Sequence, residues 1–73
     1  MEVLLPAFSL RLKALRKEKH VTQKEMASLL EKTERHYQDI EAGRINVSAT
    51  TLILLAKYFH VSTDYLLGLQ EER

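Results

Sequence analysis

The amino-acid sequence predicts a small all-α domain built from five helices. Apolar residues recur at helical spacing along most of the 73-residue chain, and no segment shows the period of two that marks a strand. Serine or threonine precedes each of these apolar segments closely enough to cap a helix. With only two glycines and one proline in the sequence, we expect short connections between the helices.

The first helix is predicted over residues 9–18. Phe8, Leu12 and Leu15 follow the i, i+4, i+7 spacing of a single helix face, so we expect them to face the core. Ser9 is the candidate cap of this helix, because its hydroxyl oxygen can accept a hydrogen bond from a free backbone amide.

The second helix is predicted from residue 23 to about residue 30. Thr22 and Glu25 are three residues apart, which is the spacing of a capping box in which the hydroxyl and the carboxylate each satisfy a free amide. Val21, just before the cap, can pack on Met26 as a hydrophobic staple. We therefore expect a well-defined start to this helix.

The remaining three helices are bounded by the same kinds of signal. A threonine or serine precedes each one, and glycine ends two of them because it tolerates the left-handed backbone found just past a helix. The predicted ranges are 34–42, 49–59 and 63–67, with caps at Thr33, Ser48 and Ser62 and terminal glycines at Gly43 and Gly68.

A chain of this length forms one small domain, which buries only about 60% of its unfolded surface. We read residues 1–8 as an N-terminal arm, 9–68 as the folded domain and 69–73 as a frayed polar tail. The longest apolar run, residues 52–56, is far too short to span a bilayer, and the acidic start broken by Pro6 does not fit a signal peptide. We therefore expect a cytoplasmic protein with no membrane partner.

The composition excludes several kinds of chemistry. Without cysteine the chain can form neither a disulfide nor a thiolate metal site, and its three histidines are too far apart in sequence to suggest metal ligands. No glycine-rich phosphate loop and no nucleophile with a matching base can be proposed from the spacing. We expect no enzyme activity, no cofactor and no small-molecule ligand.

The charge distribution gives a weak indication of a partner. The net charge is only +1, but residues 11–24 carry six lysines and arginines against one glutamate. A basic surface of this kind can meet phosphate groups. The alternative is an ordinary solvated helix face of mixed charge.

The second and third predicted helices are joined by only a few residues. So short a connection forces the two helices to cross steeply, and the small side chain of Ala27 permits their close approach. This is the geometry of a helix-turn-helix, whose second helix can enter the major groove of DNA. Similar helix pairs also occur in domains that never contact nucleic acid, so this geometry does not establish function alone.

Residues 12–67 resemble the Cro/lambda-repressor-like (XRE-type) helix-turn-helix family. The matching segments are LKALRKEKHVTQKEMASLL, TERHYQDIEAGR and LILLAKYFHVSTDYLLG. Within them lie the typical motifs in order: Arg16, Thr22-Gln23, Glu41-Ala42-Gly43 and residues 61–68, VSTDYLLG. The resemblance implies a five-helix lambda-repressor-like domain that binds double-stranded DNA and regulates transcription.

Two positions depart from the family pattern. Glu31 stands in the turn where the family usually has glycine, and a side chain in left-handed backbone there costs on the order of 1 kcal/mol. Tyr37 replaces the isoleucine or valine that usually faces the core from the third helix. The larger ring of Tyr37 can change the angle at which that helix meets DNA.

The outward side of the third helix, about residues 34–42, carries the candidate base-reading residues. Arg35 is the strongest candidate, because its guanidinium can pair with guanine O6 and N7, although it can instead pair with Asp39 one turn later. Gln38 can read adenine, and Glu34 and Asp39 can accept from cytosine N4.

Six further residues are candidates for contact with DNA phosphates. The resemblance implies that Gln23 bonds a phosphate and steadies the start of the third helix; its alternative role is that of an ordinary polar first residue. The full set is Thr22, Gln23, Lys32, Thr33, His36 and Arg44. Arg11 and Lys13 in the first helix are weaker candidates for the same role.

The resemblance also implies a structural ion pair between Arg16 and Glu41, which would join the first helix to the third. Candidate dimer contacts are Leu54, Tyr58 and Tyr65, because the family usually has polar residues at the first two positions and the three side chains can form an exposed apolar patch. Alternatively, these side chains cover the core of a monomer.

The sequence as a whole predicts a sequence-specific DNA-binding regulator, expected to be a repressor. It would bind a pseudo-palindromic operator as a homodimer and insert its third helix in the major groove. The alternative is a protein-interaction module or an antitoxin-type domain with weak affinity for DNA. That alternative is favoured by the acidic residues Glu34, Asp39 and Glu41, which outnumber Arg35 in the third helix.

Overall fold

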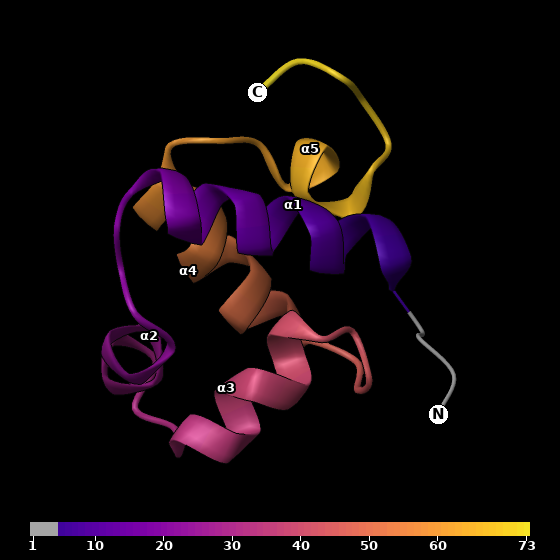
Figure 1. Ribbon diagram of the computed structural model, residues 1–73. Helices are drawn as coiled ribbons and strands as arrows, with labels where there is room; N and C mark the ends of the chain where they lie inside the picture. Colours follow the sequence, from indigo (N-terminus) through magenta and orange to yellow (C-terminus); the bar gives the residue numbers. More distant parts are fainter. Residues whose placement is uncertain (1–4) are drawn as a thin grey trace.

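The computed structural model describes residues 5–73, and over this range it contains five α-helices and no strand (Figure 1). The all-α fold class predicted from the sequence is therefore confirmed. The helices are α1 Pro6–Glu18, α2 Gln23–Leu29, α3 Glu34–Glu41, α4 Ala49–Phe59 and α5 Thr63–Leu67.

Four of the five helices begin at a capping hydroxyl, as predicted. In each case the side-chain oxygen of the cap accepts a hydrogen bond from the backbone amide three residues later, which satisfies one of the free amides of the first turn. The caps are Thr22, Thr33, Ser48 and Ser62. At α2 the capping box is complete, because Glu25 also accepts from the amide of Thr22 over 3.0 Å.

The start of α1 differs from the prediction. The helix begins at Pro6, whose ring fixes a helical φ and whose missing N–H would have no partner in a first turn. Residues 6–8 of the predicted N-terminal arm therefore belong to α1, and Leu5 is the N-cap of that helix. Residues 1–4 of the predicted arm lie outside the described residues. The proposed cap Ser9 lies inside the helix, where its hydroxyl donates to the backbone carbonyl of Glu41 over 2.6 Å.

All five helices end in the same backbone motif. At the end of α2 the amide of Glu31 donates to the carbonyl of Ser28, and the amide of Lys32 donates to that of Ala27. This pair of hydrogen bonds requires left-handed backbone at the residue whose amide makes the first of the two bonds. Glu31 has a φ of 56° there, as expected from the family's glycine. The left-handed residues are His20, Glu31, Gly43, His60 and Gly68.

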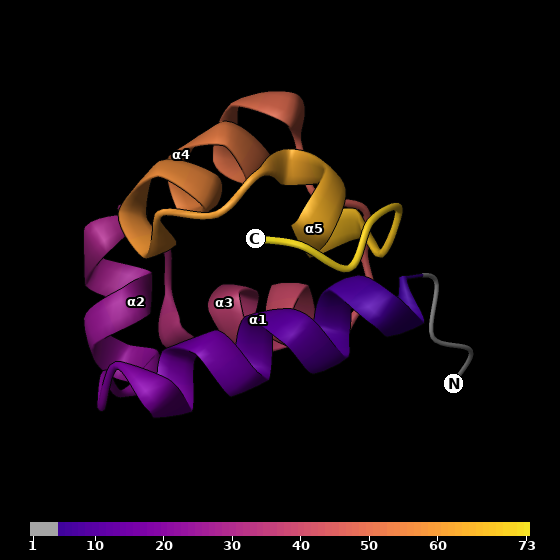
Figure 2. The same ribbon diagram turned by 90° about the horizontal axis from the view of Figure 1, so that it is seen from above.

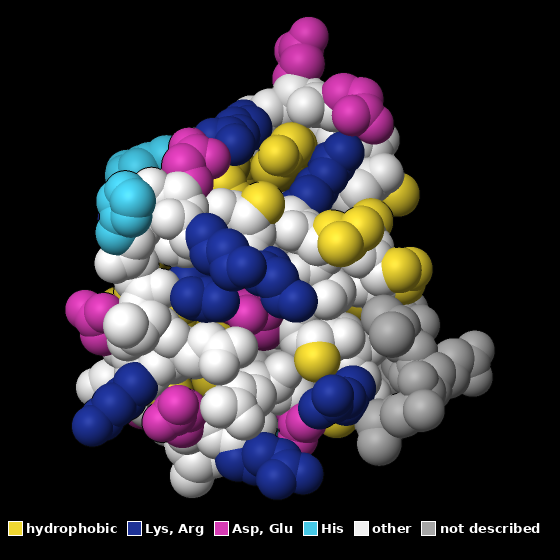
Figure 3. Space-filling model, viewed as in Figure 1, with side chains coloured by type: hydrophobic (Ala, Val, Ile, Leu, Met, Phe, Trp, Pro, Cys, Tyr) yellow, Lys and Arg dark blue, Asp and Glu magenta, His cyan; other side chains and the backbone are white. Residues whose placement is uncertain are grey.

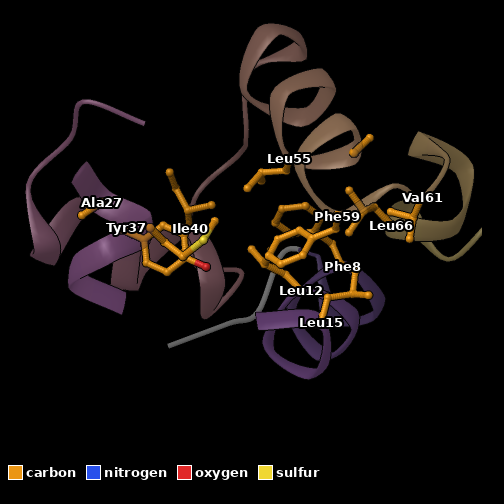
Figure 4. Close-up of a cluster of buried hydrophobic side chains, with 12 residues drawn as sticks. Phe8, Leu12, Leu15, Ala27, Tyr37, Ile40, Leu55, Phe59, Val61 and Leu66 are labelled. Carbon is orange, nitrogen blue, oxygen red and sulfur yellow. The ribbon is translucent and has the colours of Figure 1, made fainter. Parts of the chain in front are cut away.

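The core is assembled from side chains of all five helices. Figure 1 shows α1 running across the front of the molecule with α2 and α3 below it, and Figure 2 shows α4 and α5 on the side of the domain opposite α1. The buried aromatic and aliphatic side chains meet between these helices (Figure 4). They include Phe8, Leu12, Leu15, Met26, Tyr37, Ile40, Leu55, Phe59 and Leu66.

The C-terminal residues fold back onto the domain, so the prediction of a frayed tail was wrong. The carbonyl of Arg73 accepts from the amide of Ser62 over 3.0 Å. The guanidinium of Arg73 forms two hydrogen bonds, of 2.9 and 2.8 Å, with the carboxylate of Glu18 on α1. Arg11 donates to the backbone carbonyl of Gln70 over 2.6 Å. These partners lie far apart in the sequence, so local composition did not reveal them.

Candidate nucleic-acid interface

Helices α2 and α3 form a helix-turn-helix. Residues 30–33 join them, and Figure 1 views α2 almost along its axis while α3 lies across the view, so the two helices cross steeply. Ala27 is 3% exposed at this packing site, which fits its predicted role of allowing close approach. Figure 2 shows the same crossing from above.

The predicted base-reading residues lie on the side of α3 that faces away from the core. Glu34 and Arg35 are exposed, and Gln38 and Asp39 are half-buried. The opposite side of the helix is buried and consists of Tyr37, Ile40 and Glu41. The folded chain therefore leaves the four candidates at a surface where they can meet a ligand.

The charges on this outward face are arranged around Asp39. Its Oδ1 atom accepts a hydrogen bond of 3.2 Å from Nη1 of Arg44, which follows the end of α3. Its Oδ2 atom lies 3.9 Å from Nε of Arg35, too far for a strong hydrogen bond. Because the Arg35 side chain is also 84% exposed, the guanidinium can leave Asp39 at little cost.

The candidate phosphate contacts lie around the same helix pair. Thr22 and Thr33 cap α2 and α3 through their oxygen atoms, which leaves each hydroxyl proton able to donate. His36 in the first turn of α3 is exposed, as is Arg44, while Lys32 in the turn is half-buried.

The candidate Gln23 has a partner inside the protein. Its side-chain amide nitrogen donates to Oε2 of Glu41 over 2.9 Å, and the residue is half-buried. The weaker candidate Arg11 points away from the helix pair, because its guanidinium donates to the carbonyls of Tyr65 and Gln70. These contacts give Arg11 a structural role in the folded protein.

Glu41 is the centre of a buried polar cluster formed by α1, α2 and α3. Its side chain is 1% exposed, and its two carboxylate oxygens accept four hydrogen bonds. Arg16 on α1 donates two of them, over 2.6 and 3.3 Å. Gln23 on α2 donates one, and the hydroxyl of Tyr37 donates another over 2.8 Å. The ion pair implied by the family resemblance is thus present and has two further donors.

These contacts keep the Glu41 carboxylate charged. Burial alone would raise its pKa, but the hydrogen bonds from Arg16, Gln23 and Tyr37 outweigh burial and hold the pKa of Glu41 below its usual value. Burial and the adjacent carboxylate raise the pKa of Tyr37 above its usual value, so the phenol stays protonated as a donor. The hydrogen bond to Glu41 raises the pKa of Arg16 in turn.

Sequence reasoning missed two members of this cluster. Tyr37 was interpreted only as a large apolar residue, although its spacing of four residues from Glu41 places both side chains on one helix face. Gln23 was assigned to phosphate, because nothing local shows that the start of α2 lies beside the end of α3.

The three candidate dimer contacts do not lie together. Leu54 and Tyr58 on α4 line a shallow groove of about 300 Å³, whose other walls are Leu29, Leu30 and Lys57. The ring of Tyr65 on α5 lies instead close to two guanidinium groups of the same chain. Arg11 is 4.2 Å and Arg73 is 5.7 Å from its centre.

The surface around these sites carries both signs of charge. In Figure 3, lysine and arginine side chains gather over α1 near the middle of the view, while the lower part over α3 shows basic and acidic groups side by side. A surface of this kind offers cations to phosphate without a strong overall field. Recognition must therefore depend on where individual side chains lie.

Comparison with known proteins agrees with this geometry. A family model described as helix-turn-helix matches residues 12–66, which include α2, α3 and most of the core. No curated protein matches the sequence. Among residues 5–73 there is no helix that combines the length and the apolar character needed to cross a membrane. The chain belongs to the Cro/C1-type, XRE-like helix-turn-helix family of DNA-binding regulators.

Proposed function

We propose that this regulator is a sequence-specific repressor that inserts α3 into the major groove of double-stranded DNA. The observation that carries the proposal is the exposure of Arg35 on the outward face of α3. Its side chain is 84% exposed, and its Nε atom lies 3.9 Å from Oδ2 of Asp39, which is only a weak ion pair. An arginine at the start of a recognition helix can reach base edges and pair with guanine through two hydrogen bonds.

The other outward residues would complete the contact. Gln38 suits adenine, and Glu34 and Asp39 suit the amino group of cytosine. Arg44 and Lys32 lie at opposite ends of α3, where they would neutralise phosphates and fix the position of the helix along the groove. If the operator overlaps a promoter, its occupation by this domain would by itself block transcription.

We also propose that the repressor binds as a two-fold dimer to a pseudo-palindromic operator. Domains with this architecture read half-sites about one helical turn apart, and one small domain contacts too few bases for high specificity. Leu54 is 50% exposed at the groove beside Tyr58, which supports this face of α4 as the dimer contact. Sedimentation of Leu54→Glu tests it: a dimer that persists would place the interface elsewhere.

The central experiment is selection from a random duplex library, followed by binding of the enriched sequence across a range of salt concentrations. We expect a palindromic motif, and Arg35→Ala should lose preference at one base pair of each half-site, worth about 1–3 kcal/mol. Lys17→Ala, an exposed cation on α1, is the matched control and should keep the motif. Binding that weakens with salt but enriches no motif would mean contact with the DNA backbone alone.

A second candidate function is a protein-interaction or antitoxin-type domain with weak DNA binding. The apolar groove of Leu29, Leu30, Leu54 and Tyr58 favours it, because exposed apolar surface often marks a protein contact. Failure of the well-folded protein to bind DNA at moderate salt would overturn the repressor proposal and support this alternative.

A further inference from the structure

Helices α2 and α3 are connected at both of their ends. Residues 30–33 join the end of α2 to the start of α3 through the chain itself. At the opposite ends, Gln23 is the first residue of α2 and Glu41 is the last residue of α3. The side-chain amide of Gln23 donates to Oε2 of Glu41 over 2.9 Å and so closes the helix pair into a ring.

The acceptor in this second connection is buried and accepts three further hydrogen bonds. The carboxylate of Glu41 is 1% exposed and is held by Arg16 from α1 and by the hydroxyl of Tyr37. A hydrogen bond to an ionised, buried acceptor is stronger and more directional than one between neutral groups. Gln23 is therefore attached to a fixed point of the core and not to a flexible surface side chain.

Two helices joined only by a short turn can still change the angle between them. A second connection at their far ends removes that freedom, because opening the angle would separate the Gln23 amide from Glu41. The outward residues of α3, including Arg35 and Gln38, move with this angle relative to the start of α2. A small rotation is enough to displace a two-hydrogen-bond contact with a base, which depends on planar alignment.

We propose that Gln23 is a positioning residue that sets the angle between α2 and α3 and thereby the sequence specificity of the recognition helix. This inference rests on the proposed function. It differs from the phosphate contact implied by the family resemblance, because a phosphate contact strengthens binding to every sequence alike. One amide proton of Gln23 would stay on Glu41 when DNA is bound, and the second would remain able to donate to a phosphate.

The test compares affinity for the selected operator with affinity for a scrambled duplex. Gln23→Met keeps the length of the side chain and deletes the donor, and we expect the ratio of the two affinities to fall about tenfold. Partial loss of folding would lower both affinities by the same factor, so it would not change the ratio. A ratio that stays constant while both affinities fall would overturn the inference in favour of a phosphate contact.

A reciprocal exchange provides the rescue experiment. Gln23→Glu alone places two carboxylates together and should reduce the ratio further than Gln23→Met does. The double variant Gln23→Glu with Glu41→Gln is compared with Glu41→Gln alone, because both variants lack the carboxylate partner of Arg16. The double variant should be the more selective of the two, since the new amide at position 41 can then donate to the new carboxylate at position 23. A double variant no more selective than Glu41→Gln alone would overturn the inference.

An experiment without DNA distinguishes failure of this inference from failure of the proposed function. If the wild-type protein selects no sequence, NMR of the free protein still tests the connection. The side-chain amide protons of Gln23 should exchange slowly with solvent, and residual dipolar couplings should show that Gln23→Met changes the angle between α2 and α3. An unchanged angle would overturn the positioning role independently of DNA.

Discussion

Nη1 of Arg44 lies 3.2 Å from Oδ1 of Asp39, so the first cation after α3 is bound to an acidic residue of the same helix. In the free protein this pair neutralises part of the surface that would face DNA. Phosphate must compete with Asp39 for Arg44, and the carboxylate itself repels phosphate. We therefore expect the contact to lower the affinity for DNA whose sequence offers Asp39 no base donor.

Replacing Asp39 should remove this restraint. We expect Asp39→Asn to raise affinity for non-operator DNA roughly threefold to tenfold at low salt, because one repulsive charge disappears and Arg44 is released. The plot of log affinity against log salt should steepen by about one phosphate contact. Asp64→Asn on α5 is the matched control and should leave both quantities unchanged. Equal slopes for wild type and Asp39→Asn would show that Arg44 does not meet phosphate.

The buried cluster around Glu41 should dominate the stability of the helix pair. Glu41→Gln leaves the guanidinium of Arg16 without its carboxylate and places an amide donor against the donors of Gln23 and Tyr37. We expect a loss of about 3 kcal/mol in the free energy of unfolding. Tyr37→Phe removes a single donor and should lose only about 1 kcal/mol. Denaturant unfolding of both variants checks this order, and similar losses would contradict it.

The same cluster predicts a dependence of stability on acid. The pKa of Glu41 is held below its usual value in the folded state, so the unfolded chain binds a proton first as the pH falls. The stabilisation by Glu41 is therefore complete above its unfolded pKa of about 4.5 and is lost as the pH falls through its lower folded pKa. Glu18 and Glu25, whose pKa values are also lowered, contribute to the same slope.

Comparing the pH dependence of unfolding for wild type and Glu41→Gln isolates the contribution of the Glu41 carboxylate. The wild-type free energy of unfolding should fall more steeply with decreasing pH, so the two curves should converge in acid. Parallel curves would mean that the pKa of Glu41 is the same in the folded and unfolded states.

The turn of the helix-turn-helix carries backbone strain at Glu31. Its φ of 56° lies in the left-handed region, where a side chain costs about 1 kcal/mol and glycine costs little. We expect Glu31→Gly to stabilise the domain by up to about 1 kcal/mol, whereas Glu31→Ala should not. Ser28→Gly, at an exposed position inside α2, is the control and should destabilise it by about 0.5 kcal/mol. Thermal unfolding would refute the strain argument if the alanine variant were as stable as the glycine variant.

Arg11 should prove structural despite its place in the basic first half of the chain. It donates to two backbone carbonyls, those of Tyr65 and Gln70, and its side chain is only 18% exposed. Arg11→Ala should therefore lower the free energy of unfolding by about 1–2 kcal/mol without changing the salt dependence of DNA binding. Lys13→Ala, an exposed neighbour, should leave stability within about 0.5 kcal/mol. A flatter salt dependence for Arg11→Ala would assign the residue to phosphate after all.

The residues that could be predicted from the sequence are those whose partners are local. Thr22 and Ser48 were recognised as caps because each bonds an amide three residues away. Ser9 has the same chemistry, but its partner is the carbonyl of Glu41, 32 residues later, so its role could not be inferred. The tail was misjudged for the same reason, since Arg73 and Glu18 are 55 residues apart.

In the candidate site, too, roles that follow from local spacing could be predicted, and roles that depend on distant partners could not. The outward position of Arg35 follows from helical periodicity, which fixes the face opposite Ile40. The pairing of Arg16 with Glu41 came from the family resemblance, and periodicity alone would not have shown it. The hydrogen bond of Gln23 depends on the angle between two helices, and no local pattern encodes that angle.

The cluster around Glu41 also determines how much of this protein can be exchanged with a relative. A peptide of α2 and α3 alone would keep Gln23 and Tyr37 but would leave the buried carboxylate without the guanidinium of Arg16. An isolated helix-turn-helix from this chain should therefore be unfolded. A graft between proteins must therefore carry α1 together with α2 and α3, and new DNA targets are better sought by changing the exposed positions of α3 in place.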